Sequence, residues 1–111
     1  MELDKAVTSV FAQLCSSLSK DDVHFMDYLL QVNFDHHWPR MEPLSATAVM
    51  IKMKELGLWK VDRRRKKCHL SYLIHLLHEI GRQDLSALVK DFGWLICQLL
   101  TVLLHLFVNL L

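Results

Sequence analysis

The sequence predicts an all-α body, a bundle of five or six short helices, followed by a hydrophobic C-terminal helix. Apolar residues recur in several segments at the spacing of one helix face, and no segment alternates apolar and polar residues over a sustained stretch. Glycine occurs 3 times and proline 2 times among the 111 residues, which disfavours a turn-rich β domain. A chain of this length is large enough for one domain and too small for two.

The apolar residues are distributed unevenly along the chain. Of the 19 residues from Gly93 to Leu111, 14 are apolar and none is charged, whereas the first 92 residues have the apolar fraction of an ordinary globular domain. We therefore predict a helical body over residues 1–92 and a hydrophobic C-terminal helix over residues 93–111.

The first part of the body contains two predicted helices. Ser19 is a typical N-cap for the second of them, and Asp21 and Asp22 lie in its first turn, where the helix dipole favours negative charge. Its buried face is predicted to contain Val23, Met26, Leu29 and Leu30. The helix before it, over residues 4–18, has an apolar face made of Val7, Val10, Phe11, Leu14, Cys15 and Leu18.

The second part of the body begins with residues 33–44, which contain both prolines and therefore predict a short or irregular element. Ser45 or Thr47 can cap the next helix, which is expected to end near Leu56, with Gly57 in the left-handed conformation. The buried residues of this helix are predicted to be Ala48, Val49, Ile51, Met53 and Leu56. A polar connection over residues 60–67 leads to a helix over residues 70–80, and a shorter helix then directs inward Leu85, Leu88, Val89 and Phe92.

Three segments of the body resemble a known family. Residues 82–85 form an Arg-x-Asp-Leu motif that opens the last helix of the body, directly after the apolar helix over residues 70–80. Residues 18–30 place an acidic residue early in a helix, before an aromatic–leucine pair, and residues 54–58 read Lys-Glu-Leu-Gly-Leu at the end of another helix. In this order and spacing, residues 4–92 resemble a death effector domain.

The resemblance implies both a fold and a function. The implied fold is the death fold, a six-helix antiparallel bundle. The implied function is non-catalytic: the domain binds other death effector domains homotypically, and it modulates the assembly of apoptosis signalling complexes as an adaptor or a decoy. Its expected partners are FADD-like adaptors, the prodomains of initiator procaspases and further copies of itself.

Asp22, Arg82 and Asp84 match the acid–Arg–Asp charge triad of that family. Residues two apart do not face each other along a regular helix, but at a helix start Asp84 can fold back towards Arg82. The planar guanidinium group of an arginine can hold two acceptors at once. The triad either orients two helices or also lies at an assembly surface, and the two roles are compatible.

Phe25 and Tyr28 are a candidate contact patch. They lie three residues apart and outside the apolar stripe of their helix, and aromatic side chains dominate the energetics of many interfaces. In the family, the pair that matches Tyr28 and Leu29 docks partners. In the alternative interpretation, one of the two rings covers an edge of the core.

Charge and motifs argue against several other functions. The formal net charge at pH 7 is +1, so nucleic acid is not an expected partner, and the basic run Arg63, Arg64 and Arg65 is interpreted as a solvated loop or a docking site for acidic partners. We find no phosphate-binding glycine loop and no nucleophile motif, and we expect neither catalysis nor a cofactor. The histidines and cysteines lack metal-ligand spacing. Three widely spaced cysteines favour a reducing, cytoplasmic environment.

Several interpretations of residues 93–111 stay open. As a helix they would be about 28 Å long, close to the thickness of a bilayer core, which favours a membrane anchor. Gln98, Thr101, His105 and Asn109 share one face, however, and lipid would leave that face unsatisfied. The segment is alternatively a helix that docks on the body or joins copies, or the end of a longer adaptor. The alternative function is a small tail-anchored membrane protein with a helical cytosolic body.

Overall fold

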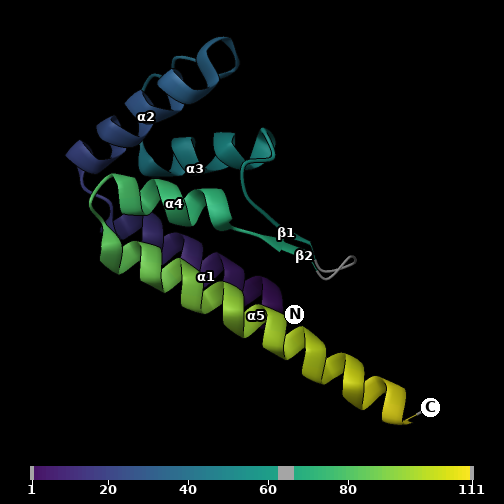
Figure 1. Cartoon of the computed structure of the whole chain (residues 1–111). Helices are drawn as coiled ribbons and strands as arrows, with labels where there is room; N and C mark the ends of the chain where they lie inside the picture. The colour runs from purple at the N-terminus through teal and green to yellow at the C-terminus, as the bar shows by residue number, and fades with distance from the viewer. Residues whose placement is uncertain (1, 63–66, 111) are drawn as a thin grey trace.

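The computed structural model describes residues 2–62 and 67–110, and over these residues the chain is all-α apart from one short hairpin (Figure 1). α4 packs on α5, and α1 lies beside α5 and also contacts α3, which packs against α2. The elements in chain order are α1 (Glu2–Ser17), α2 (Lys20–Phe34), the 3-10 helix η1 (Asp35–His37), α3 (Ala46–Glu55), β1 (Lys60–Asp62), β2 (Lys67–His69), α4 (Ser71–Glu79) and α5 (Gln83–Leu110).

The predicted N-cap at Ser19 is confirmed, and of the two candidates for the next helix, Ser45 and Thr47, Ser45 is the N-cap. The hydroxyl of Ser19 accepts the backbone N–H of Asp22 at 3.1 Å, and the carboxylate of Asp22 accepts the backbone N–H of Ser19 at 3.0 Å. This capping box satisfies two donors that the first turn of α2 leaves without a helical partner. The hydroxyl of Ser45 accepts the backbone N–H of Ala48 and so caps α3. Gly57, just after α3, has a φ of 76°, the left-handed conformation that glycine adopts without strain.

The helices of the body share one hydrophobic core. The prediction for the buried face of α3 is wrong in part, because Ile51 and Leu56 are exposed and Met50 is buried instead. The side of α3 that faces the core therefore carries Val49, Met50 and Met53. The side chains that are most completely buried come from all the long helices: Leu14, Met26, Leu30, Val49, Met50, Met53, Leu76, Leu77 and Ile96.

The connection predicted over residues 60–67 contains a two-stranded antiparallel hairpin. β1 and β2 pair Lys60 with His69 and Asp62 with Lys67, and three residues per strand are too few to show a clear alternation in the sequence. The buried ring of Trp59 holds the start of the hairpin against the body. Its indole N–H donates to the carbonyl of Met50 at 3.0 Å.

The last helix of the body and the hydrophobic segment form one continuous helix. α5 runs from Gln83 through Gly93 to Leu110, so the change in composition at Gly93 is not a break in the backbone. Ile96 is still buried, and beyond it α5 projects away from the other helices (Figure 1). Among the residues described, no helix has both the length and the apolar character required to cross a membrane.

Candidate functional site

Arg82 joins the end of α1 to the starts of α2 and α5. Its Nη1 donates to the carboxylate of Asp22 at 2.6 Å and to the backbone carbonyl of Ser17 at 2.9 Å. Its Nε and Nη2 donate to the two carboxylate oxygens of Asp84 at 3.1 and 3.0 Å. The structure thus brings together the three residues that the resemblance assigns to a charge triad. It adds the backbone carbonyl of Ser17, to which no sequence signal points.

The charges of this cluster stabilise one another. Burial acts to raise the pKa of Asp22, but the backbone N–H of Ser19 and the guanidinium of Arg82 together lower it below its ordinary value. The hydrogen bonds from Arg82 lower the pKa of Asp84, and the two carboxylates, Asp84 first, raise the pKa of Arg82. All three groups are therefore charged at neutral pH.

The shape of the cluster follows from the local chain. Asp22 is fixed by the capping box of α2, and Asp84 lies in the first turn of α5, where its carboxylate faces back to Arg82. The side chain of Asp22 is mostly shielded, whereas that of Asp84 is mostly exposed. The cluster can therefore fix the angle between α2 and α5 and also present a carboxylate at the surface.

An apolar stripe lies on the exposed side of α2. Phe25 is 49%, Tyr28 63% and Val32 61% exposed, and their spacing of three and four residues places them along one side of the helix. Val32 was not among the predicted contact residues, although its spacing from Phe25 and Tyr28 is the signal that could have identified it. We call Phe25, Tyr28 and Val32 the α2 stripe.

Leu29 does not belong to the α2 stripe. It is partly buried and packs against the hydrophobic core, so the structure leaves Tyr28 open to solvent and turns its neighbour inward. The other predicted docking group, Arg63, Arg64 and Arg65, lies outside the described residues. Of the predicted contact residues, Phe25 and Tyr28 are thus the two that are exposed side chains of the described chain.

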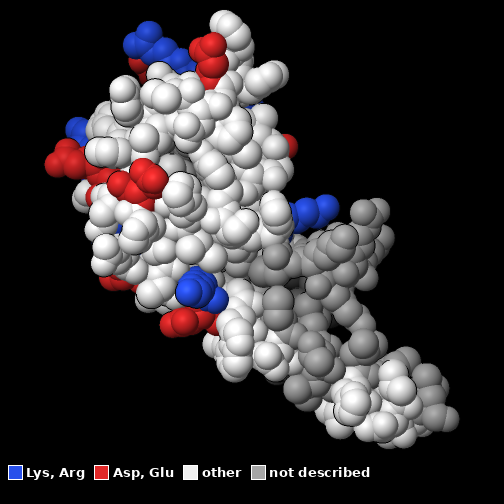
Figure 2. Space-filling model, viewed as in Figure 1, with Lys and Arg blue, Asp and Glu red and all other residues white. Residues whose placement is uncertain are grey.

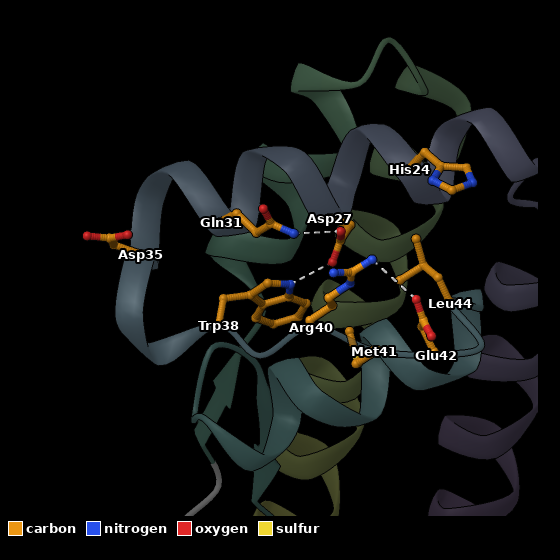
Figure 3. Close-up of a pocket in the computed structure, with 9 residues that line it drawn as sticks. All are labelled: His24, Asp27, Gln31, Asp35, Trp38, Arg40, Met41, Glu42 and Leu44. Carbon is orange, nitrogen blue, oxygen red and sulfur yellow. Dashed lines mark hydrogen bonds and ion pairs between the residues drawn. The ribbon is translucent and has the colours of Figure 1, made fainter.

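A groove of about 710 Å³ lies between α2 and residues 38–44 (Figure 3). The indole N–H of Trp38 donates to the carboxylate of Asp27 at 2.7 Å, and the side-chain amide of Gln31 donates to the same carboxylate at 2.9 Å. Arg40 pairs with Glu42 at 3.4 Å, and both side chains line the groove. The polar groups of this groove are therefore largely engaged with one another, which fixes the loop after η1 on α2.

Cys15 lies beside a smaller cavity of about 340 Å³, between the end of α1 and the start of α3. Burial raises the pKa of its thiol above the ordinary value, and a hydrogen bond with Thr47 opposes this shift only in part. The thiol is therefore protonated at neutral pH, and a protonated thiol is a weak nucleophile.

Comparisons with protein-family models, with curated proteins and with solved structures found no match to this chain. The residues that bear on function are therefore those of the charge cluster around Arg82 and of the α2 stripe.

Proposed function

We propose that this protein is a death effector domain, a non-catalytic module that binds other death effector domains and modulates the assembly of apoptosis signalling complexes. The observation that carries the proposal is the contact of Arg82 with Asp22 and Asp84. The same three residues are those that the resemblance pairs, although Asp22 and Arg82 are 60 positions apart in the chain. A chance match of the short Arg-x-Asp-Leu motif would not require that contact.

The proposed fold is the death fold. α1, α2, η1, α3, α4 and the first part of α5 would be its six helices, in the order that the motifs require. The hairpin of β1 and β2 would be an addition between the fourth and fifth of these helices.

The α2 stripe is the proposed docking surface. Two of its three side chains are aromatic, and aromatic side chains contribute strongly to binding because they bury a large area at a small entropic cost. The charge cluster lies at the start of the same helix and joins it to the start of α5, so that it would position the stripe for a partner. The proposed partners are FADD-like adaptors, the prodomains of initiator procaspases and further copies of this chain.

A pull-down tests this proposal. The full chain should retain a FADD-like adaptor and an initiator procaspase prodomain, and Tyr28→Ala and Arg82→Ala should each reduce the retained amount about tenfold or more. Ile51→Ala is the matched control, because Ile51 is exposed to a similar degree on α3, outside the α2 stripe. Absence of binding by the wild type, or unchanged binding by both variants in a folded state, would contradict the proposal.

The alternative function, a small tail-anchored membrane protein, concerns residues 93–111. The observation that favours it is the absence of any charged residue after Asp91. It conflicts with Gln98, His105 and Asn109, polar residues of the same helix that a bilayer would enclose in hydrocarbon. Sedimentation of the full chain with phosphatidylcholine vesicles tests this alternative, and a chain that stays in the supernatant would contradict it.

A further inference from the structure

The groove between α2 and residues 38–44 is more acidic than the chain as a whole, whose formal net charge is +1. On the face of the molecule drawn in Figure 2, acidic and basic side chains are interspersed. The groove, in contrast, is lined by three acidic side chains and one basic one, with His24 counted as neutral: Asp27, Asp35, Glu42 and Arg40. Arg40 and Glu42 pair with each other, but both are more than three-quarters exposed, so the pair is weak. The groove therefore has an excess of negative charge that its own arginine does not balance.

The carboxylate of Asp27 has neutral hydrogen-bond donors and no cationic partner. Its two oxygens accept the indole N–H of Trp38 at 2.7 Å and the side-chain amide of Gln31 at 2.9 Å. Among the residues that the structure describes, no lysine, arginine or histidine forms an ion pair with it. The two donors are uncharged, so they hold the carboxylate in place without compensating its charge. A carboxylate has about four acceptor positions, and two of them remain for a further donor.

The end of α2 adds to the negative potential in the groove. Asp35 follows the last residue of α2 and lines the groove, so the C-terminal end of this helix lies beside it. The helix dipole places partial negative charge at that end, and α2 has no basic residue in its last turn to offset it. Asp27 is also partly buried, and an unpaired charge costs more free energy there than in water. A cation that entered the groove would therefore relieve an existing cost.

The rest of the lining is apolar and fixed in position. Trp38 belongs to the hydrophobic core, with 5% of its surface exposed, and Met41 and Leu44 pack against that core. Because the indole N–H of Trp38 is bonded to Asp27, the ring and the carboxylate hold each other in place (Figure 3). Apolar groups beside a carboxylate suit a side chain that has a methylene stem and a cationic head.

We propose that this groove binds an arginine side chain from a basic segment of a partner protein. The guanidinium would donate two parallel hydrogen bonds to the carboxylate of Asp27, and the methylene stem would lie along Trp38 and Met41. Arginine fits better than lysine because its fork matches the two oxygens of a carboxylate, as Arg82 does at Asp84. At about 710 Å³ the groove is as large as sites that hold drug-sized ligands, so it accommodates the residues beside the arginine as well.

The groove and the α2 stripe are separate surfaces on adjacent sides of α2. Asp27 of the groove and Tyr28 of the stripe are consecutive, which places them about 100° apart around the helix. Binding of arginine in the groove therefore does not depend on the function proposed above, and the two proposals can fail separately.

An NMR titration of the isotope-labelled full chain tests the proposal. The probe is the peptide acetyl-Ala-Ala-Arg-Ala-Ala-amide, which should shift the indole N–H signal of Trp38 with a saturable Kd on the order of 1 mM. The same peptide with norleucine in place of arginine should cause no saturable shift. A peptide with lysine should bind more weakly, because an ammonium group cannot bond both oxygens in parallel. N-acetylarginine amide should also bind more weakly, because it leaves most of the groove empty.

Substitutions separate the charge of Asp27 from its structural bond. Asp27→Asn retains an oxygen that can accept the indole N–H of Trp38 but removes the charge, so the Kd for the arginine peptide should rise about tenfold. Arg40→Ala removes the basic side chain of the groove, so the Kd should fall about twofold, which a general loss of structure could not cause. Asp21→Asn is the matched control, because Asp21 is an exposed acidic residue of the same helix outside the groove. Its Kd should equal that of the wild type.

Several results would overturn the proposal. They are the absence of a saturable shift at Trp38, an equal Kd for Asp27→Asn and Asp21→Asn, weaker binding by Arg40→Ala than by the wild type, and a norleucine peptide that binds as tightly as the arginine peptide. Equal affinity for the lysine peptide would contradict the choice of arginine. Equal affinity for N-acetylarginine amide would assign the groove to a small guanidinium compound and contradict the choice of a protein segment.

Discussion

At the scale of single residues, Arg82 is the charged side chain that joins α1, α2 and α5. Its guanidinium contacts two carboxylates and one backbone carbonyl that belong to three helices. A lysine in its place could not bind Asp84 through two parallel hydrogen bonds, since an ammonium group lacks the planar fork. Arg82→Lys should therefore keep the positive charge of the cluster but lose the two parallel hydrogen bonds to Asp84.

The cluster predicts how stability depends on pH. The pKa values of Asp22 and Asp84 are lowered in the folded chain, so their contribution to stability is complete above the unfolded value of about 4 and is lost as the pH falls through the folded values. Urea unfolding from pH 7 down to pH 2 should show this loss for the wild type and a smaller loss for Arg82→Ala.

Arg40→Ala is the control for this measurement, because Arg40 forms an exposed ion pair with Glu42 at 3.4 Å and no such cluster. Its unfolding free energy should follow the pH dependence of the wild type. Equal acid sensitivity of the wild type and Arg82→Ala would contradict the role given to the cluster.

At the scale of elements, α2 carries both proposed parts of the interaction surface, and its start depends on one serine. Ser19→Ala removes the acceptor of the capping box and should lower the free energy of unfolding by about 1 kcal/mol. Chemical denaturation measures this change. Ser16→Ala is the control, since its hydroxyl bonds a carbonyl within α1 and caps no helix start, and a loss of equal size there would contradict the assignment.

The helix starts were predictable because their signals are local. Ser19 and Ser45 cap through residues three positions away, and Gly57 ends α3 by its own conformation. The buried side of α3 was less predictable. Apolar residues surround much of that helix, and only packing against neighbouring helices decides that Met50 is buried and Ile51 exposed. Leu29, in contrast, is partly buried against the core, as its spacing along the helix predicts.

At the scale of the whole molecule, composition and backbone divide the chain differently. The sequence changes character at Gly93, but α5 passes through it, because one glycine costs a helix only about 1 kcal/mol and Ile96 beyond it is still buried. Asp22 and Arg82 lie 60 positions apart, and their contact was predictable only through the family resemblance. The spacing of residues along the chain does not show which distant helices meet.

The proposed function joins these scales. The charge cluster joins the starts of α2 and α5, and α2 presents the stripe of Phe25, Tyr28 and Val32 at the surface.

The most direct test of the central claim is a titration of the full chain against the death effector domain of a FADD-like adaptor. The wild type should bind with a saturable Kd, and Phe25→Ala/Tyr28→Ala should raise that Kd about tenfold or more, equivalent to about 1.4 kcal/mol, while Ile51→Ala leaves it unchanged. No saturable binding, or one Kd shared by the wild type and a folded Phe25→Ala/Tyr28→Ala protein, would contradict the claim.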